Sequence, residues 1–300
     1  MKHLIIGNGV AGVTAAQAIV RADPAAEVHI FGAEPYPYYR RPRLWEYIAG
    51  EVEQEALYFR PAAWYAEQGI ALHLGTPVVG LDPAGHRITL ADGAEVEYDR
   101  LLLATGSRPF VPPCEGTDKQ GVFTLRTLDD AQAIREYAGQ VATAIIIGGG
   151  LLGLETARAL RSAGLSVTVV EFAHHLLTRQ LDAEGGEVLQ AILEGQGLHI
   201  ITQGATVAVL GDERASGIRL KDGREVAGEL VLFSTGIRSE VALARAAGLT
   251  VGRGVVVDRH LRTSAEDVYA AGDVAEFEGR VYGIIPAALE QAQAAAANMV

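Results

Sequence analysis

Short apolar runs, each followed by glycines and then by a longer helical pattern, recur along the chain. Residues 4–6 form an apolar run that leads directly into a glycine turn at residues 7–12. Residues 145–147 and 148–153 repeat this arrangement in the second half of the chain. An alanine-rich stretch follows each turn. A short apolar run, a tight turn and a longer periodic stretch in this order predict a strand followed by a helix.

Each predicted helix leads to a second apolar run that ends near an acidic residue. Glu34 lies just beyond the run at 28–31, and Glu171 directly follows the run at 167–170. A carboxylate about 20 residues after a glycine turn is suited to accept hydrogen bonds from a ribose diol. At Glu171 it should favour NADH over NADPH, because it would repel a 2′-phosphate. Arg179 lies near enough in sequence to weaken this preference, and an ordinary exposed acid is the competing interpretation of either carboxylate.

A second repeated feature supports a duplicated architecture. Asp92-Gly93 and Asp222-Gly223 are dipeptides typical of tight hairpin turns, and each lies between alternating segments. Each hairpin leads into an apolar run, at residues 101–106 and 230–236. We therefore predict an α/β fold with two Rossmann-like domains in series, each with an added β-meander.

The segment from residue 242 to residue 300 is too short for a third unit of this kind. Its apolar runs at 255–258 and 268–273 fit strands that return to the first domain. The predicted first domain therefore comprises residues 1–113 and 242–300. The second domain, residues 114–241, is inserted into it.

The last predicted helix begins at Pro286, because proline is favoured in a first helical turn. It runs to Val300 without a glycine cap and ends on apolar residues. Such an ending is expected of an interrupted helix, in a truncated chain or after the natural loss of a domain.

The three glycines of each turn have separate tasks in a nucleotide-binding unit. The first permits the turn, the second lets the backbone approach a pyrophosphate, and the third allows helix and strand to pack closely. The following helix presents free N–H groups to the phosphates. Plain turn glycines are the alternative, but two copies between a strand and a helix are more specific. The residues assigned to the two phosphate sites are Gly7, Gly9, Val10, Ala11, Gly12, Gly148, Gly150, Leu151, Leu152 and Gly153.

Composition narrows the range of functions. The length of 300 residues predicts two domains, and the net charge of −12 argues against nucleic acid or an anionic membrane as a partner. The single cysteine, Cys114, excludes a disulfide or a dithiol pair within this chain. No secretory signal and no apolar run near the ~20 residues of a membrane helix is visible, so a cytoplasmic protein is expected. No residue cluster has the spacing of a metal site.

Together these features resemble the FAD-dependent pyridine nucleotide–disulfide oxidoreductases. The resemblance covers essentially the whole chain and is strongest to rubredoxin reductase and to the flavin portion of NADH-dependent nitrite reductase. It rests on both glycine turns and on the segments at residues 39–44, 104–109, 263–264 and 270–273. It implies FAD in the first domain and NADH in the second.

The resemblance also implies roles for individual residues. Asp273 matches the aspartate that hydrogen-bonds the ribityl and phosphate region of FAD, and Arg41 and Pro42 match residues beside the pyrophosphate and the ring. Glu155 matches an acid that approaches the nicotinamide, although an acid placed to complement the helix dipole is the alternative. The remaining matching positions are Val78 or Val79 at the adenine, Ala104, Thr105, Gly106, Gly236, Gly272 and Pro286.

The chain departs from the family pattern at three points. Residues 43–48 hold no cysteine where disulfide-reducing members carry a pair and where peroxidase, oxidase and coenzyme A-disulfide members carry one. Trp45 and Glu46 stand where many ferredoxin-reductase relatives place a lysine. The family's C-terminal interface domain is expected to be absent, which leaves the oligomeric state open. No side chain is assigned a catalytic role.

Two functional hypotheses follow. The first is an FAD-dependent enzyme that passes hydride from NADH to flavin and then electrons to an external acceptor. That acceptor is a rubredoxin-like small iron protein, a nitrite reductase component or a small oxidant. The second is a flavin-bearing docking or sensing module of a larger redox assembly, with little activity alone. A thioredoxin-reductase-like enzyme is disfavoured because the chain has no Cys-x-x-Cys.

Overall fold

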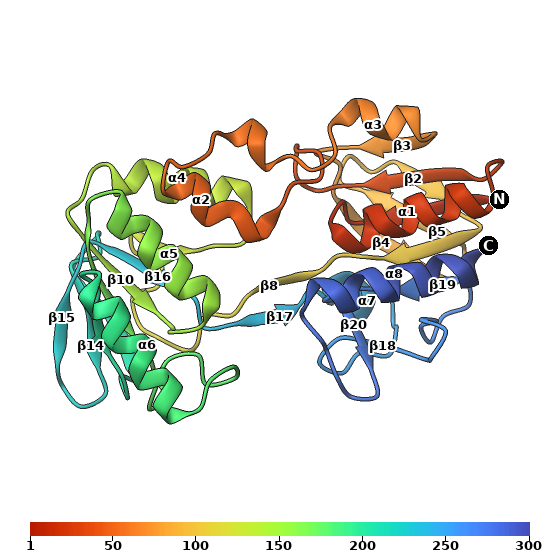
Figure 1. Cartoon of the computed structure of the whole chain (residues 1–300). Helices are drawn as coiled ribbons and strands as arrows, with labels where there is room; N and C mark the ends of the chain where they lie inside the picture. Colours follow the sequence, from red (N-terminus) through yellow and green to blue (C-terminus); the bar gives the residue numbers. More distant parts are fainter. The chain divides into compact units, whose positions relative to one another are not determined.

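The computed structural model describes residues 1–300, which form two units (Figure 1). Unit 1 comprises Met1–Tyr39, Tyr58–Arg108 and Ile237–Val300, and unit 2 comprises Arg40–Leu57 and Pro109–Gly236. The chain therefore leaves unit 1 twice, first for a short excursion and then for the main part of unit 2. The limits of unit 2 fall a few residues before the predicted domain limits, and the excursion was expected in the first domain.

Unit 1 is built on a five-stranded parallel sheet in the order β19-β7-β1-β2-β3. These strands are β1 (Lys2–Ile6), β2 (Glu27–Phe31), β3 (Ile70–His73), β7 (Arg100–Leu103) and β19 (Val268–Ala270). The helices of the unit are α1 (Val10–Ala22), α3 (Ala62–Glu67), α7 (Ala242–Ala246) and α8 (Ile285–Met299). The edge strand β19 comes from the returning C-terminal segment, as the sequence predicted.

Unit 2 repeats this sheet in the order β12-β11-β10-β16-β9, again with all strands parallel. Its strands are β9 (Val122–Thr124), β10 (Thr143–Ile147), β11 (Ser166–Val170), β12 (His199–Ile201) and β16 (Leu230–Phe233). Its helices are α2 (Leu44–Ile48), α4 (Leu128–Ala138), α5 (Leu151–Ser162) and α6 (Ala183–Gly195), with short 3-10 helices at Arg41–Arg43 and Gln54–Leu57.

Each unit also carries the predicted antiparallel meander. The meander strands are β4 (Val78–Asp82), β5 (Arg87–Leu90) and β6 (Glu95–Glu97) in unit 1, and β13 (Thr206–Leu210), β14 (Gly217–Leu220) and β15 (Glu225–Ala227) in unit 2. Two smaller pairs join β8 (Ser107–Pro109) to β17 (Ile237–Ser239), and β18 (Val255–Val257) to β20 (Ala275–Phe277). The α/β fold class with two Rossmann-like sheets is therefore confirmed.

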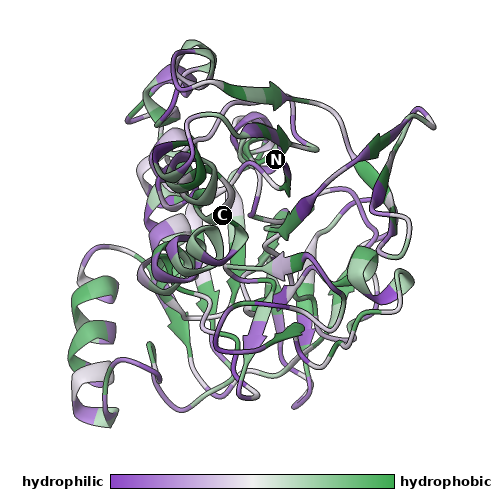
Figure 2. Ribbon diagram, turned by 90° about the vertical axis from the view of Figure 1, so that its right-hand side faces the viewer, coloured by the Kyte–Doolittle hydropathy of each residue, from purple (hydrophilic) through white to green (hydrophobic).

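The predicted strands at 101–106, 230–236 and 268–273 are shorter in the structure. Each ends at the third or fourth residue of its main apolar run, at Leu103, Phe233 and Ala270. The residues after each strand form loops at the C-terminal edge of the sheet, where the glycine turns also lie. In the hydropathy-coloured ribbon, hydrophobic residues concentrate in the strands and hydrophilic residues in the loops (Figure 2).

Small side chains allow α1 and α8 to pack side by side in unit 1 (Figure 1). On α8, Ala288, Ala292 and Ala296 recur at the spacing of one helix face, and all three are buried. On α1, Ala15 and Ala16 are buried as well. Because alanine loses no side-chain entropy on burial, these helices approach closely at little cost. This packing holds α8 against α1 in unit 1.

The short excursion belongs to unit 2 because its aromatic side chains pack on helices of that unit. The guanidinium of Arg158 on α5 lies 5.5 Å from the ring centroid of Trp45, and that of Arg135 on α4 lies 4.6 Å from the ring centroid of Tyr47. Such cation–π contacts add to the close packing of α2 against α4 and α5.

A buried histidine should make the stability of unit 1 depend on pH. His3 on β1 is only 1% exposed, and neither ring nitrogen has a hydrogen-bond partner. Burial lowers the pKa of His3, and the positive N-terminus and Arg100 lower it further. The unfolded chain therefore binds this proton more readily, so stability should fall as the pH drops below about 6.5.

We expect His3→Leu to reduce this loss of unfolding free energy between pH 7 and pH 5, because leucine fills a similar volume without a titrating group. Urea denaturation of both proteins at both pH values measures the effect. An equal loss in the two proteins would show that His3 is not the responsible group.

Candidate functional site

The first glycine of each turn lies against the backbone of a neighbouring strand end. Gly7 follows β1 with φ of 121°, and a Cβ atom there would lie 2.1 Å from the carbonyl oxygen of Ala104. Gly148 follows β10 with φ of 117°, and a Cβ atom there would lie 2.3 Å from the carbonyl oxygen of Ser234. Neither contact tolerates a side chain, so both turns require glycine.

The third glycine lets each helix begin close to its turn. A Cβ atom on Gly12 would lie 1.9 Å from the carbonyl oxygen of Gly7. A Cβ atom on Gly153 would lie 2.2 Å from the carbonyl oxygen of Gly148. Any side chain at these positions would push the helix away from the strand that precedes it.

The middle glycine of each turn faces open space instead. A Cβ atom on Gly9 or on Gly150 would meet no atom within 4 Å. These two glycines are the N-caps of α1 and α5, and neither helix has a side-chain cap or an acidic residue in its first turn. Free N–H groups therefore open onto an uncovered surface, which is the arrangement that a pyrophosphate needs. Both turns fit a bound dinucleotide.

Backbone hydrogen bonds after β2 and β11 relate the two units residue by residue. The amide nitrogen of Gly32 donates to His73, and that of Glu171 donates to Ile201, both at 2.8 Å. The carbonyl groups of the same two residues accept from Thr76 and Gly204, both at 2.9 Å. Two residues later, Glu34 accepts from Gly75 at 3.0 Å and Ala173 accepts from Gln203 at 2.9 Å. The matching pairs are Gly32 with Glu171, Ala33 with Phe172, and Glu34 with Ala173.

The two predicted ribose acceptors therefore occupy different positions, two residues apart in the shared backbone pattern. Both remain predictions as ligands of a ribose, but they present their carboxylates from different points of the loop. The sequence did not distinguish them, because each simply follows an apolar run by a few residues.

Different side chains at two matching positions explain why the predicted carboxylate lies at a different point of the loop in each unit. In unit 2, Glu171 accepts from the amide nitrogens of Gly149 at 2.5 Å and of Ala173 at 2.7 Å. A Cβ atom on Gly149 would lie 3.0 Å from the carboxylate, so this glycine leaves room for it. In unit 1, Asn8 stands in place of Gly149 and Gly32 in place of Glu171. A Cβ atom on Gly32 would lie 3.2 Å from the Asn8 side chain, so the same space is already filled.

The Asn8 side chain ties the first glycine turn to the aromatic segment at residues 36–39. Its amide donates to the carbonyl oxygen of Tyr36 at 3.3 Å, and its oxygen accepts from the Tyr65 hydroxyl at 2.8 Å. Burial raises the pKa of Tyr65 to about 12, so this hydroxyl stays protonated. The Tyr39 hydroxyl donates to Glu34 at 2.5 Å. Sequence reasoning missed Asn8 and Tyr65 because their partners lie 28 and 57 residues away along the chain. It also missed this role of Tyr39, although Glu34 lies only five residues away.

Asp273 lies in unit 1 beside the residues that follow β7. Its carboxylate accepts from the Ser107 hydroxyl at 2.8 Å, and its carbonyl accepts from the Ser239 hydroxyl at 2.6 Å. The preceding Gly272 donates to the Gln291 side chain on α8 at 2.8 Å. Thr105 is held by the carbonyl oxygen of Glu240 at 2.8 Å. The predicted residues Ala104, Thr105, Gly106, Gly272 and Asp273 thus share one unit with the first glycine turn.

Other predicted flavin contacts are distributed differently. Val79 on β4 is exposed, and Pro286 lies in the first turn of α8, both in unit 1. Arg41 and Pro42 belong to unit 2, where the Arg41 guanidinium donates to the carbonyl oxygen of Arg126 at 2.7 Å. The structure therefore does not join these two residues to the first glycine turn within one unit.

Glu155 lies half-buried in α5, close to the second glycine turn in sequence. Burial raises the pKa of its carboxyl group, and the negative charge of Glu46 raises it further. Arg43 donates to Glu46 at 2.8 Å and 2.5 Å, and these bonds lower the pKa of Glu46. Unit 2 thus holds two carboxyl groups whose pKa values are shifted in opposite directions, that of Glu46 downward by Arg43 and that of Glu155 upward by burial.

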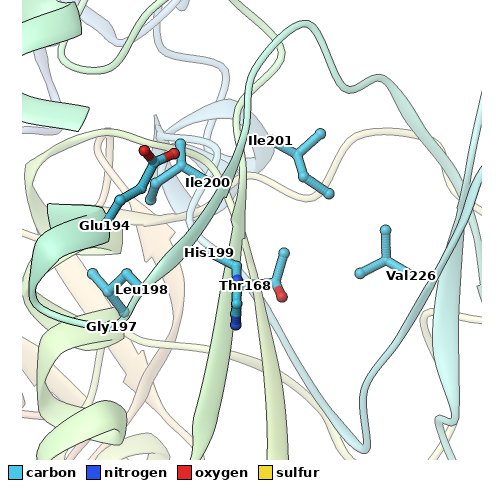
Figure 3. Close-up of a pocket in the computed structure, with 8 residues that line it drawn as sticks. All are labelled: Thr168, Glu194, Gly197, Leu198, His199, Ile200, Ile201 and Val226. Atoms are coloured by element: carbon cyan, nitrogen blue, oxygen red, sulfur yellow. The ribbon is translucent and has the colours of Figure 1, made fainter. Parts of the chain in front are cut away.

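Unit 2 also has an open hollow of about 560 Å³ (Figure 3). It runs along the edge strand β12 and is bounded by Val226 on β15. Its lining residues are Thr168, Glu194, Gly197, Leu198, His199, Ile200, Ile201 and Val226. None of them belongs to a glycine turn or to the predicted nucleotide-binding residues.

Comparison with known proteins shows similarity along nearly the whole chain. The family model described as pyridine nucleotide-disulphide oxidoreductase matches residues 1–298. The nitrite reductase [NAD(P)H] of Bacillus subtilis (strain 168) is 37% identical over 298 residues, which are 99% of this chain and 37% of that protein. The ferredoxin–NAD(+) reductase component of the biphenyl dioxygenase system of Paraburkholderia xenovorans (strain LB400) is 37% identical over 279 residues, 93% of this chain and 68% of that protein.

A solved structure agrees with these matches. The ferredoxin reductase for the CYP199A2 system from Rhodopseudomonas palustris superposes with a TM-score of 0.94 at 30% identity, covering 99% of this chain and 76% of that one. The matches confirm the resemblance inferred from the motifs. The chain spans less than two fifths of the length of the first curated relatives that it matches.

Proposed function

Because the chain belongs to the pyridine nucleotide-disulphide oxidoreductase family, whose members depend on FAD and NAD(P)H, we propose that it carries hydride from NADH to FAD and electrons onward to an external acceptor. We assign FAD to unit 1 and NADH to unit 2. The observation that carries this proposal is the pair of open glycine turns, each at a helix N-terminus and each followed by a carboxylate.

The chain's own residues bind and orient the two nucleotides. The N–H groups at Gly9 and Gly150 bind the two pyrophosphates, and Glu34 and Glu171 bind ribose hydroxyls. Asp273, held by Ser107, accepts hydrogen bonds from ribityl hydroxyl groups of FAD, next to the phosphate region. FAD, when bound, supplies the electron chemistry of the reaction. Glu155 lines the nicotinamide end of the NADH site, where burial raises the pKa of its carboxyl group.

The acceptor lies outside this chain because the chain has no pair of thiols to receive the electrons. Cys114 is the single cysteine, and burial raises the pKa of its thiol, which disfavours the reactive thiolate. One relative is named as a ferredoxin–NAD(+) reductase component and another as a nitrite reductase. We infer that a small iron protein or a nitrite reductase component takes the electrons in the cytoplasm. No helix has both the length and the apolar character needed to cross a bilayer.

A dye-linked assay tests the proposed activity. The FAD-loaded chain should oxidise NADH repeatedly with ferricyanide as the acceptor, and much more slowly without it, since an external acceptor completes the cycle. The rate at which NADH absorbance falls, followed with and without ferricyanide, measures this difference. Absence of turnover by a chain with FAD bound would contradict the proposal.

The length comparison favours a second candidate function. In the nitrite reductase relative, the matching region is 37% of a longer protein. The chain would then be a flavin-bearing docking or sensing module, reduced by NADH but with little turnover alone. Rapid reduction of the flavin combined with slow dye-linked turnover would support this candidate over the first.

A further inference from the structure

Phe172 is the most exposed large hydrophobic side chain of the protein, with 76% of its surface accessible. It directly follows Glu171 at the C-terminal end of β11. An aromatic ring with this exposure offers a free π-face to a ligand. Its place beside the proposed ribose acceptor makes a ligand of unit 2 the candidate occupant.

The backbone on both sides of Phe172 is fixed. The Glu171 carboxylate accepts from the amide nitrogens of Gly149 and Ala173, which ties the loop to the glycine turn. Backbone hydrogen bonds from Gly204 to Glu171, and between Gln203 and Ala173, hold the loop to the chain after β12. The aromatic ring thus projects from a rigid support, one residue from the proposed ribose acceptor and next to the phosphate-binding turn.

Folding does not require an aromatic ring at this position. In unit 1 the matching residue is Ala33, and the same three backbone hydrogen bonds form around it. An alanine is therefore sufficient for this loop, and the phenyl group of Phe172 adds nothing to its backbone geometry. The phenyl ring is therefore better explained by contact with a ligand than by a role in holding the loop.

We propose that Phe172 is a ligand-binding residue that stacks on the adenine base of the dinucleotide in unit 2. The inference rests on the proposed NADH site. With the pyrophosphate at Gly150 and the ribose at Glu171, the adenine is the next group along the ligand and reaches the loop that carries Phe172. A base has a flat π-face that an exposed aromatic side chain covers, and such stacking contributes about 1–3 kcal/mol per base.

The test separates the adenosine half of the ligand from the nicotinamide half. On the FAD-loaded chain, Phe172→Ala should weaken ADP-ribose binding about 10-fold by calorimetry, and Phe172→Tyr should restore it to within about 3-fold. Reduced nicotinamide mononucleotide, which lacks adenine, should reduce the flavin of Phe172→Ala and of the unmodified chain at equal rates. Val188→Ala removes another exposed apolar side chain of unit 2 and should leave ADP-ribose binding unchanged.

Two results would overturn the inference. Unchanged ADP-ribose binding by Phe172→Ala would overturn the inference while leaving the NADH site in place. The ring would then be available to a protein partner instead. An equal loss of rate with the mononucleotide and with NADH would point to a general structural role. If the unmodified chain binds neither ADP-ribose nor NADH, the proposed function fails together with the inference. Thermal unfolding of each variant confirms that it is folded.

Discussion

A Gly9→Val variant should fold but lose FAD. The Cβ atom and both methyl groups would occupy the open space in front of the first glycine turn, where the pyrophosphate has to approach the N–H groups of α1. Losing two charge-assisted hydrogen bonds costs about 3 kcal/mol or more, which corresponds to at least about 100-fold in affinity. The backbone of Gly9 is extended, with φ of −100°, so valine fits it without strain. Replacing the N-cap glycine costs only about 1 kcal/mol of stability.

The measurement is the flavin absorbance of the purified variant after incubation with FAD and gel filtration. The protein should be colourless, and it should still bind ADP-ribose in unit 2. The control is Gly195→Val, since Gly195 is equally open but lies at the end of α6, far from either turn in sequence. A yellow Gly9→Val protein would remove unit 1 as the flavin site.

Gly150→Val should give the opposite result, a yellow protein whose flavin is reduced only slowly by low concentrations of NADH. Gly150 is also an extended N-cap residue with open space where a Cβ would stand, with φ of −81° and ψ of 175°. The same loss of phosphate hydrogen bonds should lower the rate of flavin reduction at low NADH concentration by at least about 100-fold. Stopped-flow absorbance of the flavin measures this rate.

The two glycine variants serve as controls for each other. Each should retain the function of the unit that it leaves intact, so a general loss of folding cannot imitate the pattern. If Gly150→Val were reduced by NADH at the normal rate, the dinucleotide would have to bind elsewhere. If both variants lost flavin, the two turns would not be separate sites.

The sequence was sufficient to predict the parallel sheets, both glycine turns, both meanders and the return of the C-terminal segment. These features are local: an apolar run, a glycine at a fixed spacing or an Asp-Gly dipeptide decides each of them. The steric need for Gly7 and Gly148 follows from the same short pattern. The family resemblance added cofactor identities that the pattern alone does not contain.

The two-residue offset between Glu34 and Glu171 was beyond sequence reasoning. It depends on backbone hydrogen bonds to residues near 73–76 and 201–204, which come from the next strand of each sheet. The placement of residues 40–57 in unit 2 was missed for a related reason. Stacking of Trp45 on Arg158 joins residues that are more than a hundred positions apart, and no local pattern encodes such a contact.

The two proposed nucleotide sites are tested most directly by the anaerobic absorbance of the purified chain, reconstituted with FAD, before and after one equivalent of NADH. We expect a yellow protein that bleaches rapidly with NADH and slowly with NADPH, because the Glu171 carboxylate would meet the 2′-phosphate. A chain that cannot be reconstituted with FAD, or that holds FAD but keeps its colour after NADH is added, would contradict the assignment of two nucleotide sites.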